Sequence, residues 1–285
     1  MRVLCLLLGL IASPALLAMS VPDARCVELA DVVVDSVGAL STKPVRQSDS
    51  QPSQWPRDEV GATVVPVPDY CRVRGTLRPA IGFEVRLPLE NWNGKFYMAG
   101  CGGFCGEVLP DRSGYSNAIN VALARGYAVV TSDAGHWGES RVDAFWAYQN
   151  RCAEIDWAHR SIPAVTHAAR KIVARFYGSP PVRSYFSGCS NGGRMGAIAM
   201  QRYPELFDGV IIGAPALDWR TLSLYSVAVT AANTDAQGRY ILDHKKLAVL
   251  HDAVVQECDA RDGLTDGLIA DPRQCRFDAR TLLCS

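Results

Sequence analysis

A serine set between glycines narrows the choice of fold more than any other feature of this sequence. Residues 188–192 are Gly-Cys-Ser-Asn-Gly, which matches the pattern G-x-S-x-G. Small residues two positions before and after Ser190 permit the sharp strand-to-helix turn called a nucleophile elbow, which projects a reactive hydroxyl above the carboxyl end of a sheet. The alternative is a turn serine that caps a helix, because this short pattern also occurs by chance. A strand pattern before Gly188 and a helix pattern from Asn191 favour the elbow.

Strand and helix patterns alternate through the part of the chain that contains this serine. Strands that alternate with helices form βαβ units, so we predict an α/β fold with a largely parallel sheet and flanking helices. The first three strands have no helix between them and are expected at an antiparallel edge. Residues 39–69 are rich in Ser, Pro and Gln and are expected to form a surface loop. The predicted strands are 71–77, 83–87, 95–99, 127–132, 182–187 and 209–212, and the predicted helices are 117–125, 158–177, 191–203, 222–232 and 243–257.

Composition excludes some classes of partner. The 285 residues include 29 basic and 29 acidic side chains, and 48% of all residues are hydrophobic. Phosphate binding requires a clustered basic surface, and the sequence has no run of Lys and Arg, so we expect no nucleic-acid partner. The length fits one domain of catalytic size with an insertion. The oligomeric state does not follow from the sequence.

The first twenty residues have the pattern of a secretory signal peptide. A short basic start is followed by an apolar stretch and by small residues, Ala18 and Ser20, that suit signal peptidase. A membrane anchor is the alternative, but the apolar run is short and Pro14 interrupts it. We therefore expect a secreted or periplasmic protein, with residues 1–20 removed and no attachment to the membrane after cleavage.

Cysteine usage agrees with export, because thiols pair in an oxidising compartment. The chain has ten cysteines, and nine remain once Cys5 leaves with the signal peptide. An odd number predicts a free thiol, an intermolecular bridge or a partner outside the sequence. The sequence leaves the pairing of Cys101, Cys105, Cys152 and Cys284 open. A disulfide from Cys101 or Cys105 could pin a tight turn in the glycine-rich segment 100–106, and a bridge from this segment to Cys152 is one candidate.

The same glycine-rich segment is a candidate oxyanion hole. It follows the strand predicted at 95–99, and closely spaced glycines allow backbone N–H groups to approach a bound carbonyl. We expect the amides of Gly103 and Asn191 to supply the two donors. A tight turn without this role is the alternative, and the two interpretations are compatible.

An acidic, glycine-containing loop near the end of the sequence is a candidate cation site. Three aspartates lie within eight residues of one another and repel unless a cation sits among them. An oxygen-rich shell suits Ca²⁺, although the spacing is not that of an EF-hand, and an acidic surface turn explains the pattern nearly as well. The expected ligands are the side chains of Asp259, Asp262 and Asp266 and the backbone carbonyls of Leu264 and Leu268.

Taken together, these motifs resemble the tannase and feruloyl esterase family of secreted α/β-hydrolases. The family pattern C-S-x-G-G is matched by residues 189–193, and the resemblance extends over nearly the whole mature chain. Further matching stretches are Thr-Ser-Asp-Ala-Gly-His at 131–136, Tyr-Pro-Glu-Leu-Phe-Asp-Gly at 203–209 and Gly-Ala-Pro-Ala at 213–216.

This resemblance implies an α/β-hydrolase core over residues 21–217 and part of an inserted lid domain over 218–285. It implies an ester hydrolase that forms an acyl-enzyme on Ser190 and cleaves esters of aromatic acids, such as feruloyl or galloyl esters. It also implies a structural Ca²⁺ in the acidic loop, closed by a disulfide from Cys258 to Cys275. Cys26 and Cys71 are expected in disulfides, and Cys189 is expected to pair with a cysteine beside the catalytic histidine.

The general base is the part of the site that the sequence does not place. Ser190 requires a histidine, and His136 is the one that follows a sheet strand. In this fold the acid and the histidine come after the nucleophile, on loops behind later strands. We therefore expect the catalytic Asp, the catalytic His and the partner of Cys189 to lie beyond Ser285, in a longer esterase. The alternative is a catalytically inactive fragment that binds calcium.

Overall fold

The computed structural model describes residues 20–49, 66–111, 118–138 and 142–283. Contacts between Cα atoms divide the chain after Leu217 into two compact units. The predicted signal peptide lies outside the described residues except for Ser20, which caps the first helix, α1 (Val21–Glu28). Within the described part of the chain, no helix has both the length and the apolar character needed to cross a membrane.

In its described residues, the first unit is built on one seven-stranded sheet with the order β1-β2-β3-β5-β4-β6-β7. The pairs β1–β2, β2–β3 and β3–β5 are antiparallel, and the pairs β5–β4, β4–β6 and β6–β7 are parallel. The predicted α/β fold with an antiparallel edge is therefore confirmed. The strands are β1 (Ser41–Val45), β2 (Tyr70–Leu77), β3 (Ile81–Pro88), β4 (Lys95–Ala99), β5 (Ala128–Ser132), β6 (Arg183–Cys189) and β7 (Gly209–Gly213).

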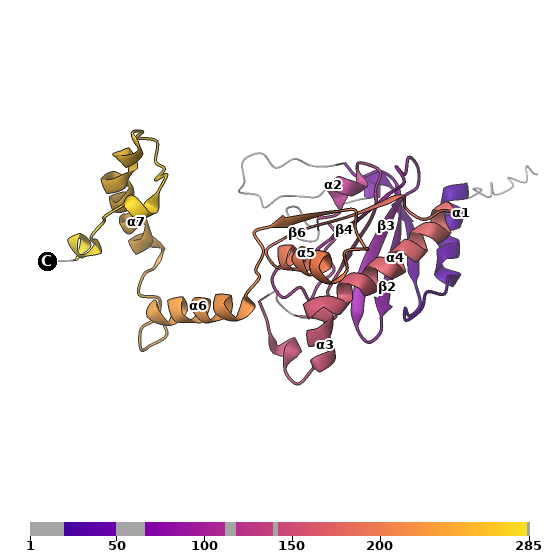
Figure 1. Ribbon diagram of the computed structural model, residues 1–285, viewed down its shortest axis with the longest axis horizontal. Helices are drawn as coiled ribbons and strands as arrows, with labels where there is room; N and C mark the ends of the chain where they lie inside the picture. The colour runs from indigo at the N-terminus through magenta and orange to yellow at the C-terminus, as the bar shows by residue number, and fades with distance from the viewer. Residues whose placement is uncertain (1–19, 50–65, 112–117, 139–141, 284–285) are drawn as a thin grey trace, which may run out of the picture. The chain divides into compact units, whose positions relative to one another are not determined.

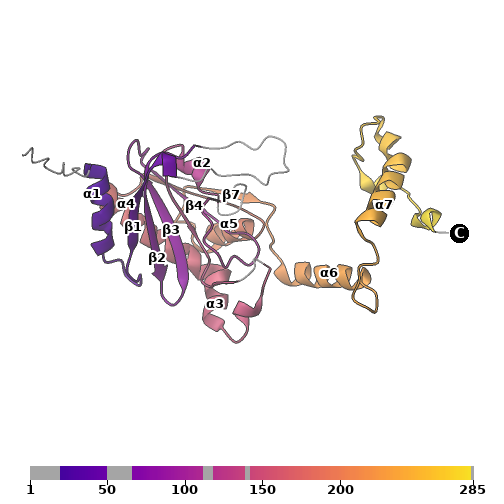
Figure 2. The ribbon, with the colours of Figure 1, turned by 180° about the vertical axis from the view of Figure 1, so that it is seen from behind.

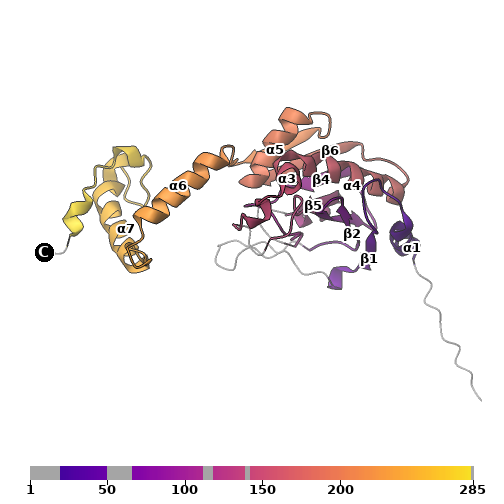
Figure 3. The same cartoon turned by 90° about the horizontal axis from the view of Figure 1, so that it is seen from below.

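Helices cover both faces of this sheet because the central strands bury side chains on both sides. Every residue of β5 is buried. Ala128 and Val130 face the larger core with α4 (Ser161–Tyr177), whereas Val129 joins a smaller core with α2 (Asn120–Leu123). Figure 1 shows α4 and α5 (Asn191–Arg202) in front of the sheet, Figure 2 shows β1 to β3 from the other side, and Figure 3 shows α3, α4 and α5 along one side.

The predicted helix over 158–177 is longer and less regular than its pattern indicated. Its apolar positions are fully buried as expected, with Ile162 and Val165 at 0% exposure. The helical segment begins at α3 (Arg151–Ile155) and passes through a π-helical turn, Asp156–Arg160, before α4. A π turn inserts one residue and shifts the side chains around the axis, so the apolar spacing begins only after it.

Two parts of the early chain differ from prediction. Residues 41–45, placed in a surface loop, form the edge strand β1, which pairs antiparallel with β2 from Ser41 opposite Arg74 to Val45 opposite Tyr70. Its short polar sequence contains Pro44, which sheets tolerate at an edge. The helix predicted over 117–125 is reduced to α2, and residue 117 lies outside the described residues. Residues 50–65 of the predicted loop also lie outside them.

The second unit contains α6 (Trp219–Ala232) and α7 (His244–Cys258), close to the two helices predicted there. Asp218 and Asp243 cap these helices with side-chain oxygens that accept backbone N–H groups. Among the residues that the structure describes there are also six short 3-10 helices, at Leu29–Asp31, Gln47–Asp49, Phe145–Ala147, Asp259–Asp262, Pro272–Gln274 and Ala279–Leu282.

Candidate active site

Ser190 stands at the turn between β6 and α5, with its side chain exposed. Its backbone has φ 58° and ψ −121°, a conformation that L-residues rarely adopt. Its N–H donates to the carbonyl of Gly213 at 3.0 Å, and its own carbonyl accepts from the amides of Arg194 and Ala216. The side chain makes no capping hydrogen bond to the helix. The geometry is therefore that of a nucleophile elbow and not that of an N-cap serine.

Glycines are required around this turn because three backbones approach closely. A Cβ on Gly188 would lie 2.4 Å from the carbonyl carbon and oxygen of Gly192. A Cβ on Gly193 would lie 2.3 Å from the Gly213 carbonyl oxygen, and one on Gly100 would lie 2.7 Å from the Gly192 Cα. These contacts bring the start of α5 against both the end of β7 and the loop after β4.

That loop is closed by a disulfide between Cys101 and Cys105, which are both buried. Gly103 lies inside the five-residue ring at φ 59°, a backbone conformation that glycine adopts at little cost. The pairing that the sequence left open for these two cysteines is therefore within the loop, and the candidate bridge to Cys152 is wrong, because Cys152 is a free, exposed thiol at the start of α3. Both cysteines of the loop are already used by their short connection.

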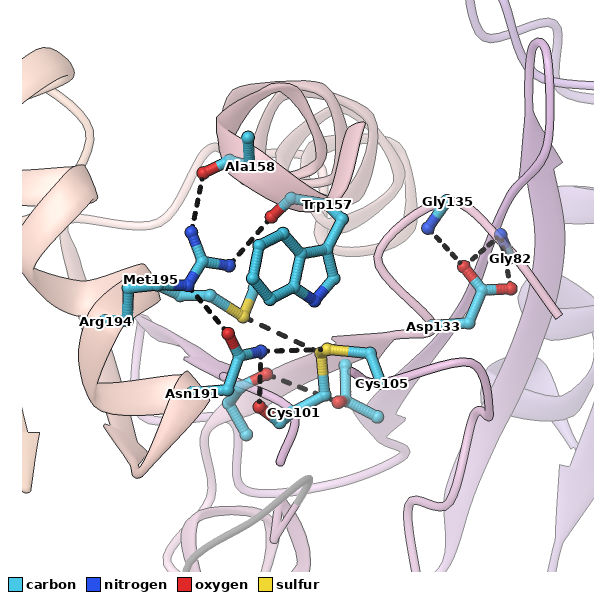
Figure 4. Close-up of a disulfide and its surroundings, with 12 residues drawn as sticks. Gly82, Cys101, Cys105, Asp133, Gly135, Trp157, Ala158, Asn191, Arg194 and Met195 are labelled. Carbon is cyan, nitrogen blue, oxygen red and sulfur yellow. Dashed lines mark hydrogen bonds between the residues drawn. A yellow bond between two sulfur atoms is a disulfide. The ribbon is translucent and has the colours of Figure 1, made fainter. Parts of the chain in front are cut away.

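A chain of polar contacts joins this loop to α5 (Figure 4). The Asn191 side chain is fully buried and donates to the Cys101 carbonyl and to Cys105 Sγ, each at 3.1 Å. Its amide oxygen accepts from Arg194 Nε at 2.7 Å. Arg194 also donates to the carbonyls of Ala158 at 2.9 Å and Trp157 at 2.8 Å, in the π-helical turn. The start of the nucleophile helix is thus connected to both flanking segments.

His136, the candidate general base, is buried behind this loop and is not paired with the serine. It stacks on Trp146 with a ring separation of 3.8 Å. Burial lowers the pKa of His136 to about 4, so the imidazole is neutral near pH 7. Among the described residues, which include all five histidines, no hydrogen bond joins a histidine to the Ser190 hydroxyl.

Asp133, in the stretch that follows β5, closes a tight turn at the same end of the sheet. Its carboxylate accepts the amides of Gly82 and Gly135 at 3.0 and 2.8 Å (Figure 4). Burial raises the pKa of Asp133 to about 7, although these amides favour the charged form. Its hydrogen-bonding groups are occupied by the turn, which indicates a structural part in holding the segment from Asp133 to His136.

The other cysteines for which the sequence predicts disulfides are bonded in two pairs, except for Cys189. Cys26 is bonded to Cys71, and Cys258 is bonded to Cys275. Cys189 is a free, half-buried thiol beside the serine.

The acidic loop has the oxygen donor atoms that Ca²⁺ prefers, but its carboxylates do not converge on one point. Asp259 is 6% exposed and accepts the amides of Asp266 and Gly267. Asp262 accepts those of Leu264 and Ala270, and Asp266 accepts that of Leu268. In the parts of the chain that the structure describes, no three acidic, His or Cys side chains are grouped so that they could hold a metal ion.

Sequence reasoning placed the serine and the loop but missed the contacts between them. Asn191 was expected to act through its backbone amide, and Arg194 was not singled out. The spacing of three residues that puts both side chains on one face of a helix was the available indication. A second was the short spacing of Cys101 and Cys105, which allows them to pair with each other.

A sheet of this topology, with a serine on a strained elbow and a disulfide-closed glycine loop beside it, defines an α/β-hydrolase. The sequence model of the family described as "Tannase and feruloyl esterase" matches residues 62–285, and the chain belongs to that family.

Relatives and solved structures agree with this assignment. An uncharacterized esterase of Xanthomonas campestris pv. campestris is 34% identical over 98% of this chain and 47% of its own length. A mono(2-hydroxyethyl) terephthalate hydrolase of Piscinibacter sakaiensis is 34% identical over 77% of this chain and 41% of its own. The crystal structure of feruloyl esterase B from Aspergillus oryzae aligns with TM-score 0.75 and 27% identity, over 93% of this chain and 51% of that one. The chain thus spans about half the length of the relatives it matches.

Proposed function

We propose that this chain carries the nucleophile and the oxyanion donors of a secreted serine carboxylic ester hydrolase that cleaves esters of aromatic acids. The observation that carries the proposal is the exposed Ser190 on its strained elbow at the N-terminus of α5. A helix N-terminus favours negative charge, which suits a developing oxyanion. Relatives named as feruloyl esterases and as a terephthalate ester hydrolase support the aromatic acyl group.

The proposed reaction proceeds through an acyl-enzyme. Ser190 Oγ attacks the ester carbonyl carbon as its proton passes to a general base, and the carbonyl oxygen becomes an oxyanion that accepts the amides of Gly103 and Asn191. Collapse breaks the bond to the alcohol, which leaves with the proton and yields acyl-Ser190. Water then attacks the acyl carbon, and the aromatic acid is released as the serine regains its proton.

The relatives contain a further part that lies outside the region aligned with this chain. We propose that an equivalent part supplies the general base and its acid partner. Two observations support this. None of the described histidines bonds to Ser190, and the relatives are about twice as long as the matched region. Cys189, free beside the nucleophile, is proposed to pair with a cysteine of that same part.

The test is turnover of methyl ferulate and methyl gallate by the purified chain beside Ser190→Ala. We expect any hydrolysis, and any covalent acyl adduct seen in the intact mass, to vanish in the variant. Hydrolysis that survives Ser190→Ala would place the chemistry elsewhere. Absence of both hydrolysis and adduct in the parent chain is what the missing general base and the second candidate, a non-catalytic chain, both predict. The same assay on a chain extended to the length of its relatives then separates them: hydrolysis that depends on Ser190 supports the first candidate, and its absence favours the second, for which the missing Ser190–His contact is the supporting observation.

We also propose that the acidic loop binds Ca²⁺ as a structural ion, through Asp259, Asp262, Asp266 and the carbonyls of Leu264 and Leu268. The all-oxygen donor set supports a hard cation, but the three carboxylates must first leave the backbone amides that they now accept. Chelation should lower the Tm, since an ion bound only to the folded state stabilises it. Asp266→Asn should abolish this shift, and Asp252→Asn, on the exposed side of α7, should keep it. An unchanged Tm on chelation would contradict calcium binding and would support the alternative, an acidic surface turn.

Export is proposed on the basis of the N-terminal pattern and the three disulfides. Such bonds form and persist in oxidising compartments. Cell fractionation with the native leader tests this: we expect protein shortened by about twenty residues outside the cytoplasm. Full-length protein retained in the cytoplasm would contradict it.

A further inference from the structure

Arg194 is a buried cation without an anionic partner. It is 7% exposed, and no ion pair in the described part of the chain includes it. Burial lowers the pKa of its guanidinium to about 10, and the flat group lies 3.9 Å from the centre of the Trp157 ring. Burying an unpaired charge is costly, and an apolar side chain would fill the same space at lower cost. The charge is retained together with a fork of donors, the guanidinium, in which each of the three nitrogens donates one hydrogen bond.

The fork fixes the orientation of the Asn191 side chain. The amide of Asn191 uses both of its ends: the oxygen accepts from Arg194, and the nitrogen donates to the Cys101 carbonyl and to Cys105 Sγ. Without the donor at 194, the buried oxygen would lose its partner, and the amide could rotate away from the loop. Arg194 therefore supports the polar attachment of the helix start to the disulfide ring.

These two attached pieces carry the two proposed oxyanion donors. One is the backbone amide of Asn191 itself, and the other is the amide of Gly103 inside the ring from Cys101 to Cys105. An oxyanion hole works only while both donors keep their position, and misplacement by about 1 Å costs on the order of 100-fold in rate. The side chain of Asn191 makes two direct hydrogen bonds from the helix to the ring, beside the contact of Met195 Sδ with Cys101 Sγ at 3.6 Å.

We propose that Arg194 is a positioning residue that acts through Asn191 to hold the two halves of the oxyanion hole together. The inference rests on the proposed role of Ser190, since an oxyanion forms at this site only if Ser190 carries out acyl transfer. Arg194 does not touch the reacting atoms. It also fastens this unit to the π-helical turn, through the carbonyls of Trp157 and Ala158.

The test compares Arg194→Met, Arg194→Lys and Asn191→Asp in the full chain, with Arg202→Ala as the control. Arg202 lies exposed at the end of the same helix. Met preserves the length of the stem but has no donor, and Lys preserves the charge but lacks the fork. Asn191→Asp retains an acceptor for Arg194, now charged, but loses the donation to the loop. It therefore separates folding from positioning.

The first readout is amide hydrogen exchange at Cys105 and Gly106, whose N–H groups bond to the carbonyls of Gly102 and Asp133. We expect exchange to accelerate by about tenfold in all three variants, the effect of roughly one lost hydrogen bond. The amides of β5 and the Arg202→Ala protein should be unchanged. Unaltered exchange at Cys105 in Arg194→Met and Asn191→Asp would overturn the proposal. An equal rise in β5 would also overturn it, because global destabilisation would then be the cause.

The second readout is esterase kinetics with methyl ferulate, in the chain extended to the length of its relatives so that the proposed general base is present. We expect kcat to fall by about 100-fold, the cost of losing an oxyanion donor, with KM nearly constant and no rescue by Lys. A fall in which KM rises and kcat is unchanged would assign the residue to substrate binding and overturn the proposal. If that extended chain shows no esterase activity while loop exchange still responds, the polar link stands and the proposed hydrolysis fails.

Discussion

Gly188→Ala offers a sharp test of the close packing at the elbow. The new Cβ would lie 2.4 Å from the carbonyl carbon and oxygen of Gly192, and backbone in the first turn of α5 cannot move as a flexible side chain would. Overpacking of this kind costs about 3 kcal/mol. Replacing glycine also reduces the entropy of the unfolded chain, which returns about 1 kcal/mol. The net loss of about 2 kcal/mol corresponds to a Tm lower by about 4 to 8 °C for a domain of this size.

Gly38→Ala is the matched control, because its Cβ would meet only the Thr76 carbonyl oxygen at an ordinary 3.8 Å. Without a clash, the only remaining effect is the lower conformational entropy of the unfolded chain, so the Tm should rise slightly. The assay is thermal unfolding by calorimetry at one pH and one salt concentration, with far-UV circular dichroism to confirm the fold. Opposite signs for the two substitutions would support the reasoning. An unchanged or raised Tm in Gly188→Ala would refute it, since the elbow would then have room for a side chain.

Three further predictions follow from features of the first unit. Ser190→Gly should raise the free energy of unfolding by about 1 kcal/mol, because relief of about 2 kcal/mol of backbone strain exceeds the roughly 1 kcal/mol that glycine costs through the entropy of the unfolded chain; urea unfolding checks this, and a Ser190→Gly protein that is less stable than Ser190→Ala would argue against strain. Removing the Cys26–Cys71 disulfide, which closes a loop of 45 residues, should cost about 4 kcal/mol in urea unfolding if the constraint acts on the unfolded chain; a loss close to zero would contradict that. The folded-state pKa of His136 is depressed from 6.5 to about 4, so its contribution to stability is present above pH 6.5 and is lost as the pH falls toward 4; a stability profile over this window should flatten in His136→Gln, and an identical profile would show that another group titrates there.

Most strands of the first unit were predictable because a short run with apolar or alternating character is bounded by turn residues. The bounds of β4 agree with prediction at both ends, and those of β5 and β7 agree within one residue. The edge strand β1 was missed because its polar sequence with Pro44 is stabilised by pairing with β2, which local pattern does not report. The π-helical turn was missed for a related reason, since an extra residue breaks the periodicity from which helices are recognised.

The parts of the site that lie within one stretch of sequence were predictable. The parts that depend on contacts between residues far apart in the chain were not. Ser190 and its glycines lie within one stretch, so the elbow followed from strand, turn and helix in order. The contact from Asn191 to Cys101 joins residues 90 apart in the chain, and that from Arg194 to Trp157 joins residues 37 apart. Such contacts exist only once the sheet has brought the loop after β4 beside α5. Spacing could indicate that Asn191 and Arg194 share a face, but not what that face meets.

The Cys26–Cys71 bond links α1 covalently to β2, the second strand of the sheet. A protease that cuts the peptide chain anywhere between these two cysteines would therefore produce two pieces that remain one molecule. Such nicked protein would migrate as intact chain on a gel without reductant and separate only when the bond is reduced. The purity of a preparation, and the survival of the N-terminal helix during storage or export, must accordingly be judged under reducing conditions.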